Sequence, residues 1–125
     1  MKLDAKTRRQ ILRIIKHARR MRGELSRSEA ETGMRHLPNE AYFKQRRKLR
    51  KRLERLDDET LLTIRVLQEG ADVSLKPGPA AIETLEGTYS TLAQRFERDQ
   101  AIEHLLKAEY LDEDLEIALR VLDST

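Results

Sequence analysis

The chain of 125 residues contains no cysteine and no tryptophan, and aromatic residues make up only 4% of it. Without cysteine it can form no disulfide bond, no thiolate metal site and no cysteine nucleophile. It also lacks a run of roughly 18 apolar residues that could span a membrane, and no signal-peptide segment follows Met1. We therefore expect a cytoplasmic protein with no membrane partner.

Motifs for catalysis and for cofactor binding are missing as well. His17, His36 and His104 do not share the i, i+4 spacing of a helical metal site. The chain has no glycine-rich phosphate loop and no Gly-x-Ser-x-Gly elbow. Acidic runs at 57–59 and 112–114 fall at expected helix starts, where the helix dipole accounts for them. We therefore expect no enzymatic activity, no catalytic residue, no cofactor and no bound metal.

Apolar residues recur at helical spacing along the chain, and nothing alternates with the period of a strand. The pattern predicts an all-α protein, with residues 1–125 forming a single compact domain of about five helices around a central buried helix. Leu and Ile on nearly every side make the helix that follows Asp57 the expected centre. The apolar stripe of the first helix consists of Ile11, Ile14, Ile15, Ala18 and Met21.

Capping residues and glycines predict where the helices begin and end. The first helix is expected from Asp4 to Arg22, with Gly23 ending it, and a short helical piece starting at Ser26 follows. The later helices are expected at Glu40–Leu56, from the N-cap Asp57 to Gly70, from Pro79 onward with a kink or a fresh start near Asp99, and over Asp112–Leu122.

Charges are segregated along the chain, although the net charge is only +3. Residues 1–55 contain 19 basic and 6 acidic residues, a net charge of +13, and residues 56–125 contain 6 basic and 16 acidic residues, a net charge of −10. Such asymmetry indicates either a polyanionic partner or an interaction between the two halves.

Basic residues lie opposite the apolar stripes of the first two helices. Residues 44–55 include eight basic residues and one acidic residue. Four like-charge pairs at i, i+4 would each destabilise this helix by about 0.2–0.5 kcal/mol, unless an anion relieves the repulsion. We predict a nucleic-acid-binding surface that consists of Lys44, Arg47, Lys48, Lys51, Arg52, Arg55, Arg9, Arg13, Lys16 and Arg20.

The sequence leaves three interpretations of these basic faces open. In one, the chain is a non-enzymatic module that binds the backbone of RNA or DNA, as a small helical subunit of a nucleoprotein complex. Only Tyr42 and Phe43 lie near, so binding would depend on phosphates and shape rather than on base sequence. In another, it is an adaptor or self-associating protein whose basic face meets an acidic protein surface. In the third, the acidic half of the chain neutralises a solvated face.

Three segments resemble a bacterial family, the domain of unknown function 3775. Residues 11–19 are similar to its first helix, residues 56–72 to its central helix with an acidic cap and a glycine-containing exit, and residues 101–122 to its C-terminal pair of short helices. Residues 68–72 depart from the tryptophan and the Gly-Arg-Gly-Asp-like exit of that family, and the second helix is more basic. The resemblance implies an all-α fold. It implies no activity, because the family has none assigned.

Overall fold

The computed structural model describes residues 1–33, 38–72 and 74–125, and this part of the chain contains six α-helices and no strand. The all-α prediction is confirmed, with six helices in place of about five. They are α1 (Ala5–Thr32), α2 (Glu40–Glu54), α3 (Asp58–Gly70), α4 (Pro79–Ala93), α5 (Arg98–Lys107) and α6 (Leu111–Asp123).

The helices α1, α2 and α3 each begin at a side-chain N-cap. The side chains of Asp4, Asn39 and Asp57 each accept a hydrogen bond from the backbone N–H three residues further on, at 2.7–3.0 Å. Each bond satisfies one of the amide groups that have no partner within the first turn of a helix. α4 begins at Pro79 as expected, directly after Gly78.

The first helix does not end at Gly23, contrary to the prediction. α1 continues through this residue to Gly33, which has a left-handed φ of 68° and donates its backbone N–H to the carbonyl of Glu29 at 2.8 Å. The short helical piece expected at Ser26 is therefore part of α1. A glycine within a helix costs about 1 kcal/mol relative to alanine. Packing on both sides of Gly23 offsets this cost, because Arg22 is bonded to α6 and Ser28 is buried.

The break expected near Asp99 is a fresh start rather than a kink. α4 ends at Ala93, and α5 begins at Arg98, where the side chain of Glu97 accepts hydrogen bonds from the backbone N–H groups of Asp99 and Gln100. This restart accounts for the sixth helix.

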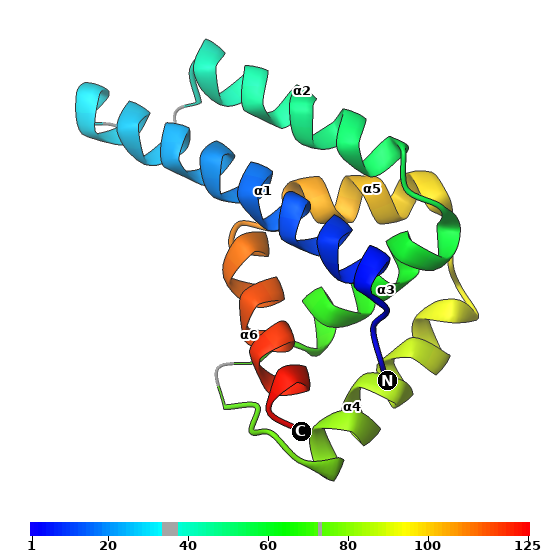
Figure 1. The fold of residues 1–125 in the computed structure, drawn as a ribbon. Coiled ribbons are helices and arrows are strands. Elements are labelled where there is room, and N and C mark those ends of the chain that lie inside the picture. The colour runs from blue at the N-terminus through cyan, green and yellow to red at the C-terminus, as the bar shows by residue number, and fades with distance from the viewer. Residues whose placement is uncertain (34–37, 73) are drawn as a thin grey trace.

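Figure 1 shows α1 and α2 lying antiparallel as a long hairpin along one side of the other helices. α1 packs against α2 and α6, and α3 packs against α4, α5 and α6. Buried side chains from all six helices form one apolar cluster, to which α1 contributes its whole expected stripe. Every residue from Thr60 to Leu67 of α3 is buried, but the prediction of one helix central to all the others is not confirmed. Over the residues the structure describes, no helix is both long and apolar enough to cross a membrane.

Candidate nucleic-acid interface

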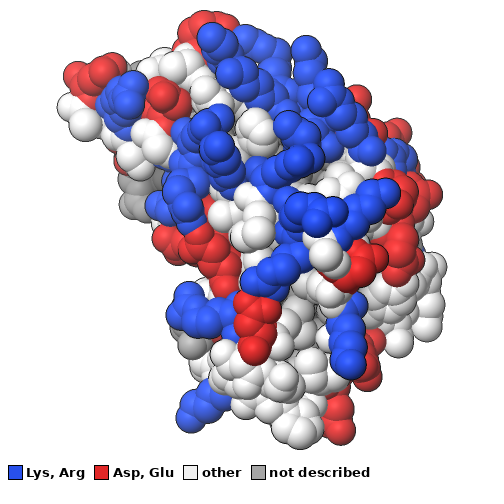
Figure 2. Space-filling view, viewed as in Figure 1, with Lys and Arg blue, Asp and Glu red and all other residues white. Residues whose placement is uncertain are grey.

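The ten basic residues predicted from the sequence lie on the outer faces of the α1–α2 hairpin. Nine of them are exposed, and Arg52 is half-buried. Figure 2 shows Lys and Arg side chains gathered over these two helices, with acidic side chains at the edges. We call this surface the basic face, and it consists of Arg9, Arg13, Lys16 and Arg20 of α1 and of Lys44, Arg47, Lys48, Lys51, Arg52 and Arg55 of α2 and its C-cap.

Helical spacing places the basic residues of each helix in a row. In α1 the steps from Arg9 to Arg20 are four, three and four residues, which keeps all four side chains opposite the buried stripe. In α2 the same steps run from Lys44 to Arg55, and Arg47 and Arg52 flank this row. Local sequence therefore determines each row, whereas the packing of α1 on α2 brings the two rows together.

His17 lies where the two rows meet. Burial lowers the pKa of this half-buried imidazole, and the positive charges of Arg52, Arg20, Lys48 and Lys16 lower it further. Two of these cations belong to α1 and two to α2, so both rows act on one imidazole. The Nδ1 atom is buried and has no hydrogen-bond partner among the described residues.

The sequence interpretation did not include His17 in the predicted surface. Its position directly after Lys16 was the only available signal, because its two α2 neighbours are distant along the chain.

The acidic half of the chain pairs with other arginines of the same two helices. These pairs lie on the sides of α1 and α2 that face α6 and α5 rather than on the basic face. The pairs are Arg8–Asp123, Arg19–Glu116, Arg22–Asp112 and Arg50–Glu103. Arg50 donates to Glu103 and thereby lowers the pKa of that carboxyl group. Neutralisation of the basic half by the acidic half thus takes place on the flanks of the hairpin.

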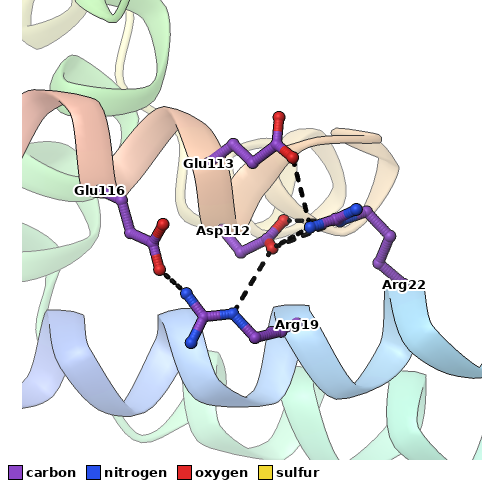
Figure 3. Close-up of polar contacts among 5 residues, drawn as sticks. All are labelled: Arg19, Arg22, Asp112, Glu113 and Glu116. Carbon is purple, nitrogen blue, oxygen red and sulfur yellow. Dashed lines mark hydrogen bonds and ion pairs between the residues drawn. The ribbon is translucent and has the colours of Figure 1, made fainter.

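The contact with the most buried carboxylate of the four joins the middle of α1 to the first turn of α6 (Figure 3). The Nε and Nη2 atoms of Arg22 donate to Asp112 at 3.1 and 2.7 Å, and this carboxylate is only 1% exposed. The hydrogen bond raises the pKa of Arg22, and Glu113 lies 3.3 Å from the same guanidinium group. Asp112 therefore does more than complement the dipole of its own helix, because it also holds α1 in place.

The basic face itself has almost no carboxylate partners. Within the described part of the chain, nine of its ten cations have no Asp or Glu oxygen within 4.0 Å. The exception is Arg47, which pairs with Glu40 of its own helix at 2.8 Å, and both side chains are exposed. The acidic half of the chain thus does not neutralise the positive charge of the basic face.

Among the described residues, the other groups considered from the sequence do not assemble into a site. Asp57 caps α3, Asp58 pairs with Arg98, and Glu59 accepts a hydrogen bond from the hydroxyl of Tyr89 at 2.7 Å. His104 is exposed, and His36 lies outside the described residues. Within those residues, no group of three or more acidic or histidine side chains could hold a metal ion.

Comparison with known proteins finds no relative of the chain: no protein family, no curated protein and no solved structure matches it. The resemblance to the domain of unknown function 3775 therefore stays a prediction. The feature of the chain that indicates a function is the basic face.

Proposed function

We propose that the chain is a non-enzymatic module that binds nucleic acid, and that the basic face contacts the phosphate backbone of RNA or DNA. One observation carries the proposal. Among the residues that the structure describes, four arginines on the flanks of α1 and α2 are paired with carboxylates of the acidic half, whereas nine of the ten cations on the outer face of the same helices have no carboxylate partner. A polyanion would supply the negative charge that the chain itself does not place there.

Repulsion between the cations of the basic face favours the binding of an anion. Lys16 and Arg20, and also Lys44 and Lys48, are like charges at i, i+4, and each such pair costs about 0.2–0.5 kcal/mol in the free protein. Phosphates between these cations would relieve the repulsion. They would also release the counterions condensed on the nucleic acid, which makes binding depend on salt.

The chemistry of the face fits contact with the backbone rather than with bases. Its members are all Lys and Arg, and they project from rigid helices into solvent. Phosphate contacts position a nucleic acid but carry no sequence information. We therefore propose binding of similar strength to different base sequences, in the cytoplasm and within a larger nucleoprotein complex.

The test is the salt dependence of binding for wild type and two matched variants. The outer-face variant carries Lys16→Gln, Lys44→Gln and Lys48→Gln, and the control variant carries Lys2→Gln, Lys76→Gln and Arg95→Gln, which removes three exposed charges elsewhere. With five or more phosphate contacts, the wild-type slope of log K against log salt should be about −3 or steeper. The outer-face variant should lose up to about 2–3 units of slope, and the control should keep the wild-type slope.

Three results would contradict the proposal. These are wild-type affinity that does not change with salt, equal weakening of binding in the two variants, and no binding to nucleic acid. The alternative in which the basic face meets an acidic protein surface predicts the last result. If that surface belongs to a second copy of the chain, light scattering should also show an oligomer that dissociates as salt is added.

A further inference from the structure

We infer that the basic face binds double-stranded nucleic acid in preference to single strands, with its two rows of cations each following one strand. The inference rests on the proposed function and goes further, because it names the form of nucleic acid. Two features of the hairpin support it, namely the layout of its charges and the scarcity of exposed aromatic side chains.

The two rows have equal length and lie side by side. Each row spans 12 residues, from Arg9 to Arg20 and from Lys44 to Arg55, and its ends are about 16 Å apart along the helix axis. Packed helices lie about 8–10 Å apart, and α1 packs along α2. The result is a rigid surface that is two helices wide, with cations along both of them.

A duplex presents phosphates in a matching form. Two backbone strands border each groove, and a B-form duplex carries one negative charge per about 1.7 Å of axis. A single strand carries about half that density and follows one path, so a strand laid along α1 would leave the row on α2 without phosphates. A duplex can engage both rows at once, because its two strands are held at a fixed separation.

The features that favour single strands are scarce on this face. Proteins that bind single strands combine a positive groove with aromatic side chains on which successive bases stack. In the described parts of α1 and α2, Phe43 is the only exposed aromatic residue, at 42% exposure. It lies near the start of α2, and its ring meets that of Tyr42 edge-on, with the centroids 5.3 Å apart. One aromatic ring at the end of a row does not form a stacking platform.

The deciding experiment compares a mixed-sequence duplex of about 20 base pairs with each of its separated strands at one salt concentration. Separate DNA and RNA duplexes of this kind show which of the two nucleic acids the protein binds. The 125-residue chain should bind at least one duplex about tenfold or more tightly than the corresponding single strands. Tighter or equal binding of the single strands would overturn the inference while leaving the proposed function intact. Binding to neither form would overturn both.

Three variants test the two-row arrangement directly. One removes charges from the α1 row (Arg9→Gln, Arg13→Gln, Lys16→Gln), one removes charges from the α2 row (Lys44→Gln, Lys48→Gln, Lys51→Gln), and the third is Phe43→Leu. Each row variant should lower the salt slope for the duplex by a similar amount, and Phe43→Leu should leave duplex affinity unchanged. Circular dichroism should show native helix content for all three.

Two outcomes of this variant series would overturn the inference. In the first, only one row variant affects binding to the duplex. In the second, Phe43→Leu weakens binding as much as the row variants do, which is the result expected for stacking of bases.

Discussion

The environment of a single histidine links the chemistry of the two basic rows. Burial and four surrounding cations lower the pKa of His17, so the free protein holds a neutral imidazole at the centre of a positive surface at neutral pH. The cations that act on it are Lys16 and Arg20 of α1 and Lys48 and Arg52 of α2. A bound polyanion would cancel much of this positive potential and raise the pKa of the imidazole.

Nucleic-acid binding should therefore be coupled to proton uptake by His17. The free protein has a pKa below 6.5 at this residue, and the complex should have a higher one. At pH values between these two pKa values, the complex then binds more protons than the free protein does. Affinity should accordingly increase as pH falls through that interval, by up to tenfold for each unit that separates the two pKa values. Titrations at a series of pH values, at constant ionic strength, measure the effect.

The control for this coupling is His17→Gln. The variant should bind nucleic acid and lose the part of the pH dependence that wild type shows near and below pH 6.5. The same substitution tests a linked effect on folding, because a lowered pKa in the folded state means that the unfolded chain binds more protons. Wild-type stability should thus decrease as pH falls below 6.5, and the variant should show a smaller decrease. An identical pH dependence in the two proteins would contradict the role assigned to His17.

Asp112 joins α6 to α1 through an ion pair in which its carboxylate is buried. Asp112→Asn removes the charge that accepts from Arg22 in a buried setting, and we expect a loss of about 1–3 kcal/mol in the free energy of unfolding. Glu113→Gln is the matched control, since Glu113 is exposed and contacts the same guanidinium at 3.3 Å. Its cost should not exceed about 1 kcal/mol. Urea unfolding monitored by circular dichroism measures both, and equal losses would contradict the assignment.

Within the helices, the two glycines of α1 show how context overrides a local signal. Gly23 lies inside the helix, and a Cβ added there would meet no described atom within 4 Å apart from its chain neighbours and the backbone of its own helix. Gly33 ends the helix with a φ of 68°, a conformation that L-residues with a side chain adopt only at a cost. Glycine is thus accommodated within the helix at position 23, whereas it terminates the helix at position 33.

This contrast predicts opposite effects of one substitution. Gly23→Ala should raise the free energy of unfolding by about 0.5–1 kcal/mol, because alanine has the higher helix propensity. Gly33→Ala should lower it by about 1–2 kcal/mol through strain in the left-handed conformation. Thermal unfolding of the two variants beside wild type provides the measurement. Destabilisation by Gly23→Ala would show that α1 does not continue through this position.

Across the whole molecule, the segregation of charge predicts how removing cations affects the free protein. The outer-face variant loses the like-charge pairs Lys16–Arg20, Lys44–Lys48 and Lys48–Arg52, each worth about 0.2–0.5 kcal/mol of repulsion. Its free energy of unfolding should therefore equal that of wild type or exceed it by about 1 kcal/mol. The interpretation in which the acidic half neutralises this face predicts a lower melting temperature instead. Measuring stability and nucleic-acid affinity on the same variant separates the two.

The candidate surface could be predicted from the sequence because it depends on spacing within single helices. Residues four, three and four apart share one face of a helix wherever that helix packs. The spacing alone could not show which other arginines would be neutralised. Arg22 and Arg50 lie beside the same apolar stripes, and their carboxylate partners, Asp112 and Glu103, come from the far half of the chain.

Caps, apolar stripes and the two basic rows are local properties, and the amino-acid sequence specifies them directly. The side chains of Asp4, Asn39 and Asp57 accept hydrogen bonds from backbone N–H groups only three residues further along the chain, so the geometry of these caps does not depend on distant segments. The continuation of α1 past Gly23, the pairing of the acidic half with the flanks of the hairpin, and the meeting of both rows at His17 depend on the tertiary structure. These features require contacts between helices far apart in the chain, and burial of one shared apolar cluster sets the relative positions of those helices.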